Sequence, residues 1–215
     1  QAYEKKKRYE DQLRELKLGI VAEKSAKGKI YNLQILAQAY ENLHRPEDTI
    51  KEYREALTAY DKLDEPGIEL IEAEAMFTDL LIRQKHNAEA YKWAKKTLAT
   101  ADQLEYGRTY PGCVQVSWDL ADLSKENGKV KESKDELSKT KECLLACYTS
   151  RASFSTLQRN AVMGLSTYGA MAAYRGLNQE AKTTLELALK EAPHLEKVYA
   201  DIVRNRCEPW LKTLK

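Results

Sequence analysis

Histidines and cysteines are the residues of this sequence that could most readily hold a metal or act as nucleophiles. Cys143 and Cys147 stand one helical turn apart, so on a helix both thiols would share one face and could bind one metal ion. A zinc site needs further Cys or His ligands, and no nearby pair supplies them. The histidines, His44, His86 and His194, fall at predicted turns, where polar residues are ordinary. We therefore expect free thiols in a reducing compartment and no metal site.

Motifs for phosphate binding and hydrolysis do not occur in the sequence. Gly28-Lys29 and Gly128-Lys129 lack both the earlier Gly and the following Ser or Thr of a phosphate-binding loop. There is no HExxH zinc motif and no GxSxG turn. The acidic residues have basic neighbours at helical spacing, which indicates ordinary i, i+4 ion pairs worth ~0.2–0.5 kcal/mol each. We expect a chain that is not an enzyme and that needs no cofactor.

Charge is nearly balanced, with 35 basic and 33 acidic residues. The basic run 5–8 is flanked by Glu4, Glu10 and Asp11, which indicates a solvated helix face instead of a phosphate-binding patch. No apolar run approaches the ~20 residues of a membrane-spanning helix, and no signal segment opens the sequence. We expect no nucleic-acid partner, no membrane insertion and an intracellular, cytoplasmic location. A first residue Gln1 in place of Met indicates a piece of a longer protein.

The elements that would position any site are helices. Gly (9) and Pro (5) are few, and they lie mostly between segments with helical periodicity. In the stretch 157–193 two apolar stripes occur, at Leu165, Tyr168, Gly169 and Ala172 and at Ala181, Leu185, Ala188 and Leu189. Between them, Gly176 can take the left-handed conformation that ends a helix, and Pro193 stops the second helix. The stretch is thus predicted to be a pair of closely packed helices.

In residue type and spacing this unit resembles the tetratricopeptide repeat, a helix–turn–helix of about 34 residues that stacks into solenoids. Three earlier stretches carry the same pattern, with Thr49, Ala90 and Ser133 at the place of Ala181. These positions are 41, 43 and 48 residues apart. Such intervals imply longer helices or loops, as in the extended arrays of kinesin light chains and vesicle-fusion adaptor proteins, which the chain resembles in format only.

The resemblance implies an all-α fold, a right-handed α-solenoid of stacked antiparallel helix pairs with an extra helix at each end. We expect one array over 1–215. Its parts are an N-terminal helix at 1–27, repeats at 29–64, 67–105, 110–148 and 155–192, a capping helix at 194–206 and a tail at 207–215. The capping helix would keep the apolar face of the last repeat from water.

The same resemblance implies where a partner would bind, because the first helix of each pair lines the concave side of such a stack. The family register places there Tyr31, Gln34, Gln38, Glu41, Asp79, Arg83, Trp118, Asp122, Lys125, Met163 and Tyr174. Their mixed charges differ from the Lys and Asn clamp with which tetratricopeptide domains hold the C-terminal carboxylate of chaperones. Tyr31 and Trp118 are the expected aromatic anchors, although an error of one residue in register would place Trp118 in the core.

Three functions fit this prediction. The first is a non-catalytic scaffold that binds a peptide or helix of a partner protein on the concave surface. The second is a ligand- or peptide-sensing regulatory module of a larger signalling or transcription-regulating protein. The third is self-association into a homo-oligomer through the solenoid ends, which the apolar residues after Pro209 favour.

Overall fold

The computed structural model describes residues 2–23, 26–60, 67–149 and 155–214. These residues form ten α-helices and two short 3-10 helices, and they contain no strand. The predicted all-α fold is confirmed. Two compact units, Gln1–Trp93 and Ala94–Lys215, divide the chain, and each has its own packing.

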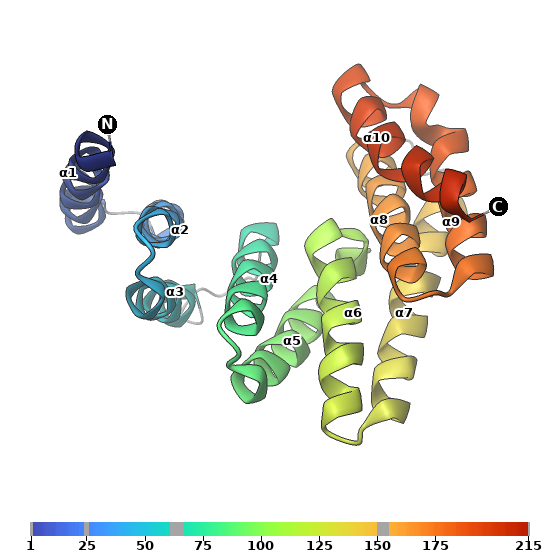
Figure 1. The fold of residues 1–215 in the computed structure, drawn as a ribbon, viewed down its shortest axis with the longest axis horizontal. Coiled ribbons are helices and arrows are strands. Elements are labelled where there is room, and N and C mark those ends of the chain that lie inside the picture. The colour runs from blue at the N-terminus through green and yellow to red at the C-terminus, as the bar shows by residue number, and fades with distance from the viewer. Residues whose placement is uncertain (1, 24–25, 61–66, 150–154, 215) are drawn as a thin grey trace. The chain divides into compact units, whose positions relative to one another are not determined.

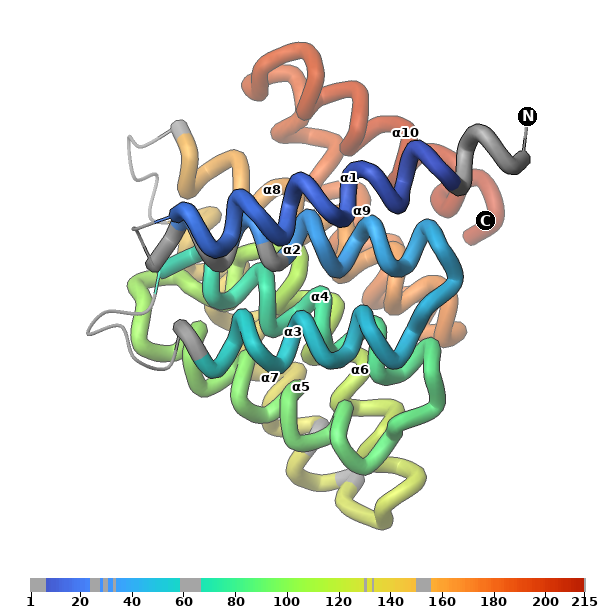
Figure 2. Tube along the Cα trace, turned by 90° about the vertical axis from the view of Figure 1, so that its left-hand side faces the viewer, coloured from blue at the N-terminus to red at the C-terminus, as the bar shows by residue number. Residues whose placement is uncertain are grey.

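Antiparallel helices build the first unit. They are α1 (Ala2–Ala22), α2 (Ala26–Asn42), α3 (Pro46–Tyr60), α4 (Ile68–Arg83) and the beginning of α5 (Asn87–Ala101). Figure 2 shows that α1, α2 and α3 lie side by side with alternating directions, and successive helices pack on one another. Leu36 and Tyr40 of α2 are buried with Ala56 of α3. The ring of Phe77 stacks on Tyr53, with 5.6 Å between centroids. Burial of these side chains is the main force that pairs the helices.

A second set of helix pairs forms the other unit. It comprises η1 (Gly107–Thr109), α6 (Pro111–Glu126), α7 (Val130–Thr149), α8 (Ser155–Tyr174), α9 (Asn178–Glu191), η2 (Ala192–His194) and α10 (Lys197–Thr213). Figure 1 shows α6 beside α7 and α8 beside α9. The central helix is α8, which contacts α6, α7, α9 and α10. Its Leu165 is buried with Leu144, Leu185 and Val203, one from each of α7, α9 and α10.

Helix ends differ from the sequence prediction at both termini. Gly28, expected to follow the first helix, lies inside α2, because α1 ends at Ala22 and α2 begins at Ala26. The predicted boundary between a capping helix at 194–206 and a tail is also wrong, because α10 runs through Pro209 to Thr213. The residues expected in the tail continue the apolar face of α10, and three of them pack on the core: Trp210, Leu211 and Leu214. That packing offsets the helical hydrogen bond that proline cannot make.

One kind of turn closes four of the helix pairs. His44, Lys85, Gly128 and Gly176 each have a left-handed backbone, with φ between 55° and 74°. In each turn the N–H of this residue and the N–H of the next bond back to carbonyls of the preceding helix, at 2.8–3.3 Å. The left-handed conformation predicted for Gly176 is confirmed. The four residues are 41, 43 and 48 positions apart, the same intervals that the sequence pattern shows.

Substitution by glycine should have opposite effects at two exposed lysines, Lys85 in one of these turns and Lys92 inside a helix. Because a side chain in the left-handed region costs roughly 1–2 kcal/mol, Lys85→Gly should raise the free energy of unfolding by about 0.5 kcal/mol after the entropy of glycine is counted. Lys92→Gly, inside α5, should lower it by about 1 kcal/mol. Urea denaturation of both variants measures the difference. Equal destabilisation by the two substitutions would contradict the left-handed turn at Lys85.

A buried arginine ties the connection before α6 to α7. The side chain of Arg108 is 5% exposed. Its Nη2 donates to Asp102 and to Glu136, each at 2.7 Å, and its Nη1 donates to the Thr140 hydroxyl at 3.3 Å. Burial opposes the charge, but the two carboxylates outweigh it and raise the pKa of Arg108 above its usual value. The Thr140 hydroxyl also bonds Ser117 at 2.7 Å, so the cluster reaches α6.

Candidate partner-binding surface

In the first unit, four of the predicted surface residues form one polar cluster. Arg83 of α4 donates from Nε to Asp79 at 2.8 Å and from Nη1 to Glu41 of α2. Gln38 donates to the same Glu41 carboxylate at 3.3 Å. The hydrogen bond to Glu41 contributes most to the raised pKa of Arg83. Two carboxylates face one guanidinium here, so the cluster keeps an excess negative charge.

A second feature of α2 is a stripe of side chains that the rest of the unit leaves uncovered. Tyr31, Ile35, Gln38 and Asn42 fall at i, i+4, i+7 and i+11, so they share one face. Tyr31 is 64% exposed, and Ile35 is exposed as well. Half-buried Gln34, also predicted for this surface, does not belong to the stripe. The stripe thus presents two large apolar side chains and two amides to solvent.

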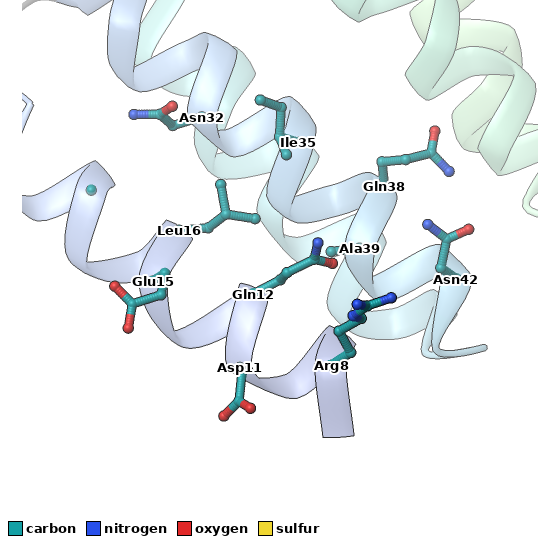
Figure 3. A pocket seen from close by; sticks show the side chains of 11 residues that line it. Arg8, Asp11, Gln12, Glu15, Leu16, Asn32, Ile35, Gln38, Ala39 and Asn42 are labelled. Carbon is teal, nitrogen blue, oxygen red and sulfur yellow. The ribbon is translucent and has the colours of Figure 1, made fainter. Parts of the chain in front are cut away.

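Beside this stripe lies a groove of about 660 Å³ between α1 and α2 (Figure 3). Leu16 of α1 and Ile35 of α2 face each other across it, while Gln12 extends toward Ala39. Asp11 and Glu15 point away from α2. The groove therefore has an apolar floor, and both amides and the charged side chains of Arg8, Asp11 and Glu15 lie at its rim. The repeat pattern puts α1 at the end of the array, so its contribution to this surface was not predicted.

In the second unit the expectation that Trp118 could be an exposed anchor is corrected. Trp118 is 3% exposed, and its ring lies 5.1 Å from that of Tyr168. The guanidinium of Arg175 covers it, 4.8 Å from the ring centroid. Of the two positions that the sequence left open, core and groove, the core is the one that the indole occupies.

The other predicted residues of this unit gather around Arg175, which the sequence analysis did not single out. Its Nε donates to Asp122 at 3.1 Å, and Lys125 lies 3.5 Å from the same carboxylate. Tyr174 is 76% exposed, with its ring 5.9 Å from the Arg175 guanidinium. Met163 is not part of this group and packs against the core. Arg175 directly follows Tyr174, the last residue of α8 that the family register places on the surface. This adjacency is the one signal in the sequence that could have identified Arg175.

Reactive chemistry is not favoured by the surroundings of the two neighbouring cysteines. Burial raises the pKa of the Cys147 thiol to about 11 and also raises that of Cys143. Both thiols are therefore protonated and weakly nucleophilic at neutral pH. The described part of the chain contains no group of three or more His, Cys, Asp or Glu residues that could hold a metal ion. None of the described helices is long and apolar enough to cross a membrane.

Comparison with known proteins gives matches among solved structures alone. No family model and no curated protein matches the sequence. The crystal structure of BtubC (BKLC) from P. vanneervenii is similar, with a TM-score of 0.60 and 13% sequence identity, over 96% of this chain and 87% of that one.

Two crystal structures of a Podosopora anserina putative kinesin light chain with nearly identical TPR-like repeats are also similar. Their TM-scores are 0.55 and 0.53, each at 15% identity. The first match covers 90% of this chain and 91% of the other, and the second covers 87% and 88%. At these identities the likeness concerns the fold. The chain has the helical-repeat fold of TPR-like proteins.

Proposed function

We propose that the chain is a non-catalytic scaffold that binds a peptide or helix of a partner protein. The binding surface is the one that α1 and α2 form. The observation that carries this proposal is the uncovered stripe of α2 beside the α1–α2 groove. Large apolar side chains left in water on a helical face, next to a hollow with an apolar floor, are typical of protein-binding sites. The amides at the rim could bond to main-chain groups of a bound segment.

The composition of the site supports a protein partner over a small substrate. The Tyr31 side chain is large and stiff, so it loses little conformational entropy when it is buried by a partner. None of the four cysteines forms a disulfide within the described residues, which fits a partner in a reducing, intracellular compartment. The charged cluster around Arg83 would add selectivity more than affinity, because its groups already pair with one another.

Site-specific photo-crosslinking tests the proposal. We would place p-benzoylphenylalanine at Tyr31 and, as a control, at exposed Glu55 on α3, and would irradiate each in cell extract. A defined protein should be captured at position 31 and not at position 55. With that protein purified, Tyr31→Ala should weaken binding about tenfold, or ~1.4 kcal/mol, whereas Glu55→Ala should leave it within about twofold.

Two results would overturn the scaffold. One is capture of the same proteins at both positions, which would indicate collision without a site. The other is unchanged affinity of the captured protein for Tyr31→Ala while the helical circular dichroism signal is intact. Tyr31 is exposed, so its loss should not disturb the fold, and a binding change would report on the surface itself.

A further inference from the structure

The second unit contains a cavity to which the family register contributes only Trp118 and Lys125. It has a volume of about 430 Å³ and lies among α6, α7, the turn after α8 and the beginning of α9. We call it the basic cavity, because four cationic side chains line it: Lys125, Lys134, Lys141 and Arg175. It is distinct from the α1–α2 groove, which belongs to the other unit.

Carboxylates of the chain neutralise this charge only in part. Glu180 accepts hydrogen bonds from Lys141 at 2.6 Å and from the Tyr168 hydroxyl at 3.1 Å. The pairing of Asp122 with Arg175, described above, leaves Lys125 a longer contact with that same carboxylate. Four cations against two anions leave an excess of two positive charges at the cavity.

Lys134 is a cation that is open to a ligand. It is exposed, and within the described residues it forms no ion pair. Lys125 is exposed as well and has only the 3.5 Å contact with Asp122. An incoming carboxylate could therefore bond these two ammonium groups without displacing the shorter ion pair of Lys141.

A buried donor gives the second indication of a ligand. The Nε1 atom of Trp118 is inaccessible to solvent and has no hydrogen-bond partner among the described residues. Trp118 itself lines the cavity. Buried indole N–H groups normally find an acceptor, so this one would gain a partner if a shift of the covering side chain let an oxygen of a ligand in the cavity reach it. Apolar walls at Leu137 and Leu177 would take the aliphatic part of that ligand.

We infer that the basic cavity binds an acidic segment of a partner protein, with a carboxylate at Lys134 and Lys125 and an aliphatic side chain against Leu137. This inference rests on the proposed scaffold function and names the chemistry of a second contact. The carboxylate of Glu180, which lines the cavity, and that of Asp122, which pairs with Lys125 and Arg175 of the lining, would repel the continuous charge of a nucleic acid. A short segment with separated acids and apolar residues avoids that repulsion.

Fluorescence anisotropy on the whole chain tests the inference. The probe is a labelled hexapeptide of sequence Glu-Leu-Glu-Glu-Leu-Glu, and the reference is the same peptide with every Glu replaced by Gln. The acidic peptide should bind about tenfold or more tightly than the reference. Lys134→Glu should weaken its binding about tenfold or more, whereas Lys190→Glu, an equal charge change at an exposed residue of the same unit that does not line the cavity, should stay within about twofold.

The Trp118 indole supplies an independent readout. The acidic peptide should change the intrinsic fluorescence of the wild type, and Trp118→Phe should abolish that change and weaken binding while the ring packing is largely kept. Equal effects of Lys134→Glu and Lys190→Glu would overturn the site, since they would indicate general charge attraction. Tighter binding of a single-stranded RNA hexamer, or full displacement of the peptide by an equal concentration of inorganic phosphate, would overturn the choice of an acidic polypeptide.

The experiments distinguish a failure of the basic-cavity inference from a failure of the proposed scaffold function. If the acidic peptide does not bind but capture at Tyr31 persists and depends on that residue, the basic cavity is wrong and the scaffold stands. If both fail, the proposed function is wrong. The two sites lie in different units, so a variant of one leaves the other intact.

Discussion

Ala181→Arg is expected to lower the free energy of unfolding by about 4 kcal/mol. Ala181 is fully buried in the core cluster of that unit, on the face of α9 that meets α8. The two helices approach so closely that a Cβ added at Gly169 of α8 would lie 2.7 Å from the Leu185 side chain of α9. An arginine has no room there and no partner for its charge.

The matched control is Thr183→Arg, which introduces the same side chain two residues away on the exposed side of α9. It should change stability by less than about 0.5 kcal/mol, because surface substitutions away from special contacts are usually mild. Urea denaturation followed by circular dichroism measures both variants. If the urea denaturation curve of Ala181→Arg overlaid that of Thr183→Arg, α8 and α9 would not pack through this position.

The repeat intervals could be predicted from the sequence because close helix packing leaves a local trace. Ala181 must be small wherever α9 meets α8, and Gly176 supplies the left-handed residue of the turn five positions earlier. Both requirements depend on neighbours along the chain. The turns at His44 and Lys85 have the same geometry without glycine, so there the apolar stripes of the flanking helices, and not the turn residue, carried the prediction.

The binding surface was predicted less accurately than the repeat intervals, because it depends on where long side chains extend. Trp118 lies at a position whose two possible environments differ by one residue of register, and contacts with Tyr168 and Arg175 decide for the core. Those contacts join residues about 50 positions apart, and no local pattern reports them. The groove beside α2 likewise depends on α1, which has no counterpart in the repeat pattern.

Arg108→Met should lower the free energy of unfolding by about 3 kcal/mol, the second largest effect expected here. Methionine keeps much of the volume but leaves the carboxylate of Glu136 without its Arg108 partner in a half-buried site. Burial alone would raise the pKa of Glu136, and the hydrogen bonds from Lys139 and Arg108 outweigh it and hold that pKa below its usual value. Without Arg108 the ionised carboxylate loses one of the two groups that stabilise it.

Arg83→Met is the control that separates burial from pairing. Arg83 also bonds two carboxylates, but its side chain is 47% exposed, and exposed ion pairs are worth only about 0–1 kcal/mol. Chemical denaturation of both variants should therefore show a loss for Arg108→Met several times that for Arg83→Met. Adding Glu136→Gln to Arg108→Met should recover part of the loss, because it removes the charge left unpaired. Equal losses for the two arginines, or no recovery, would mean that the Arg108 cluster is as solvated as the surface pairs.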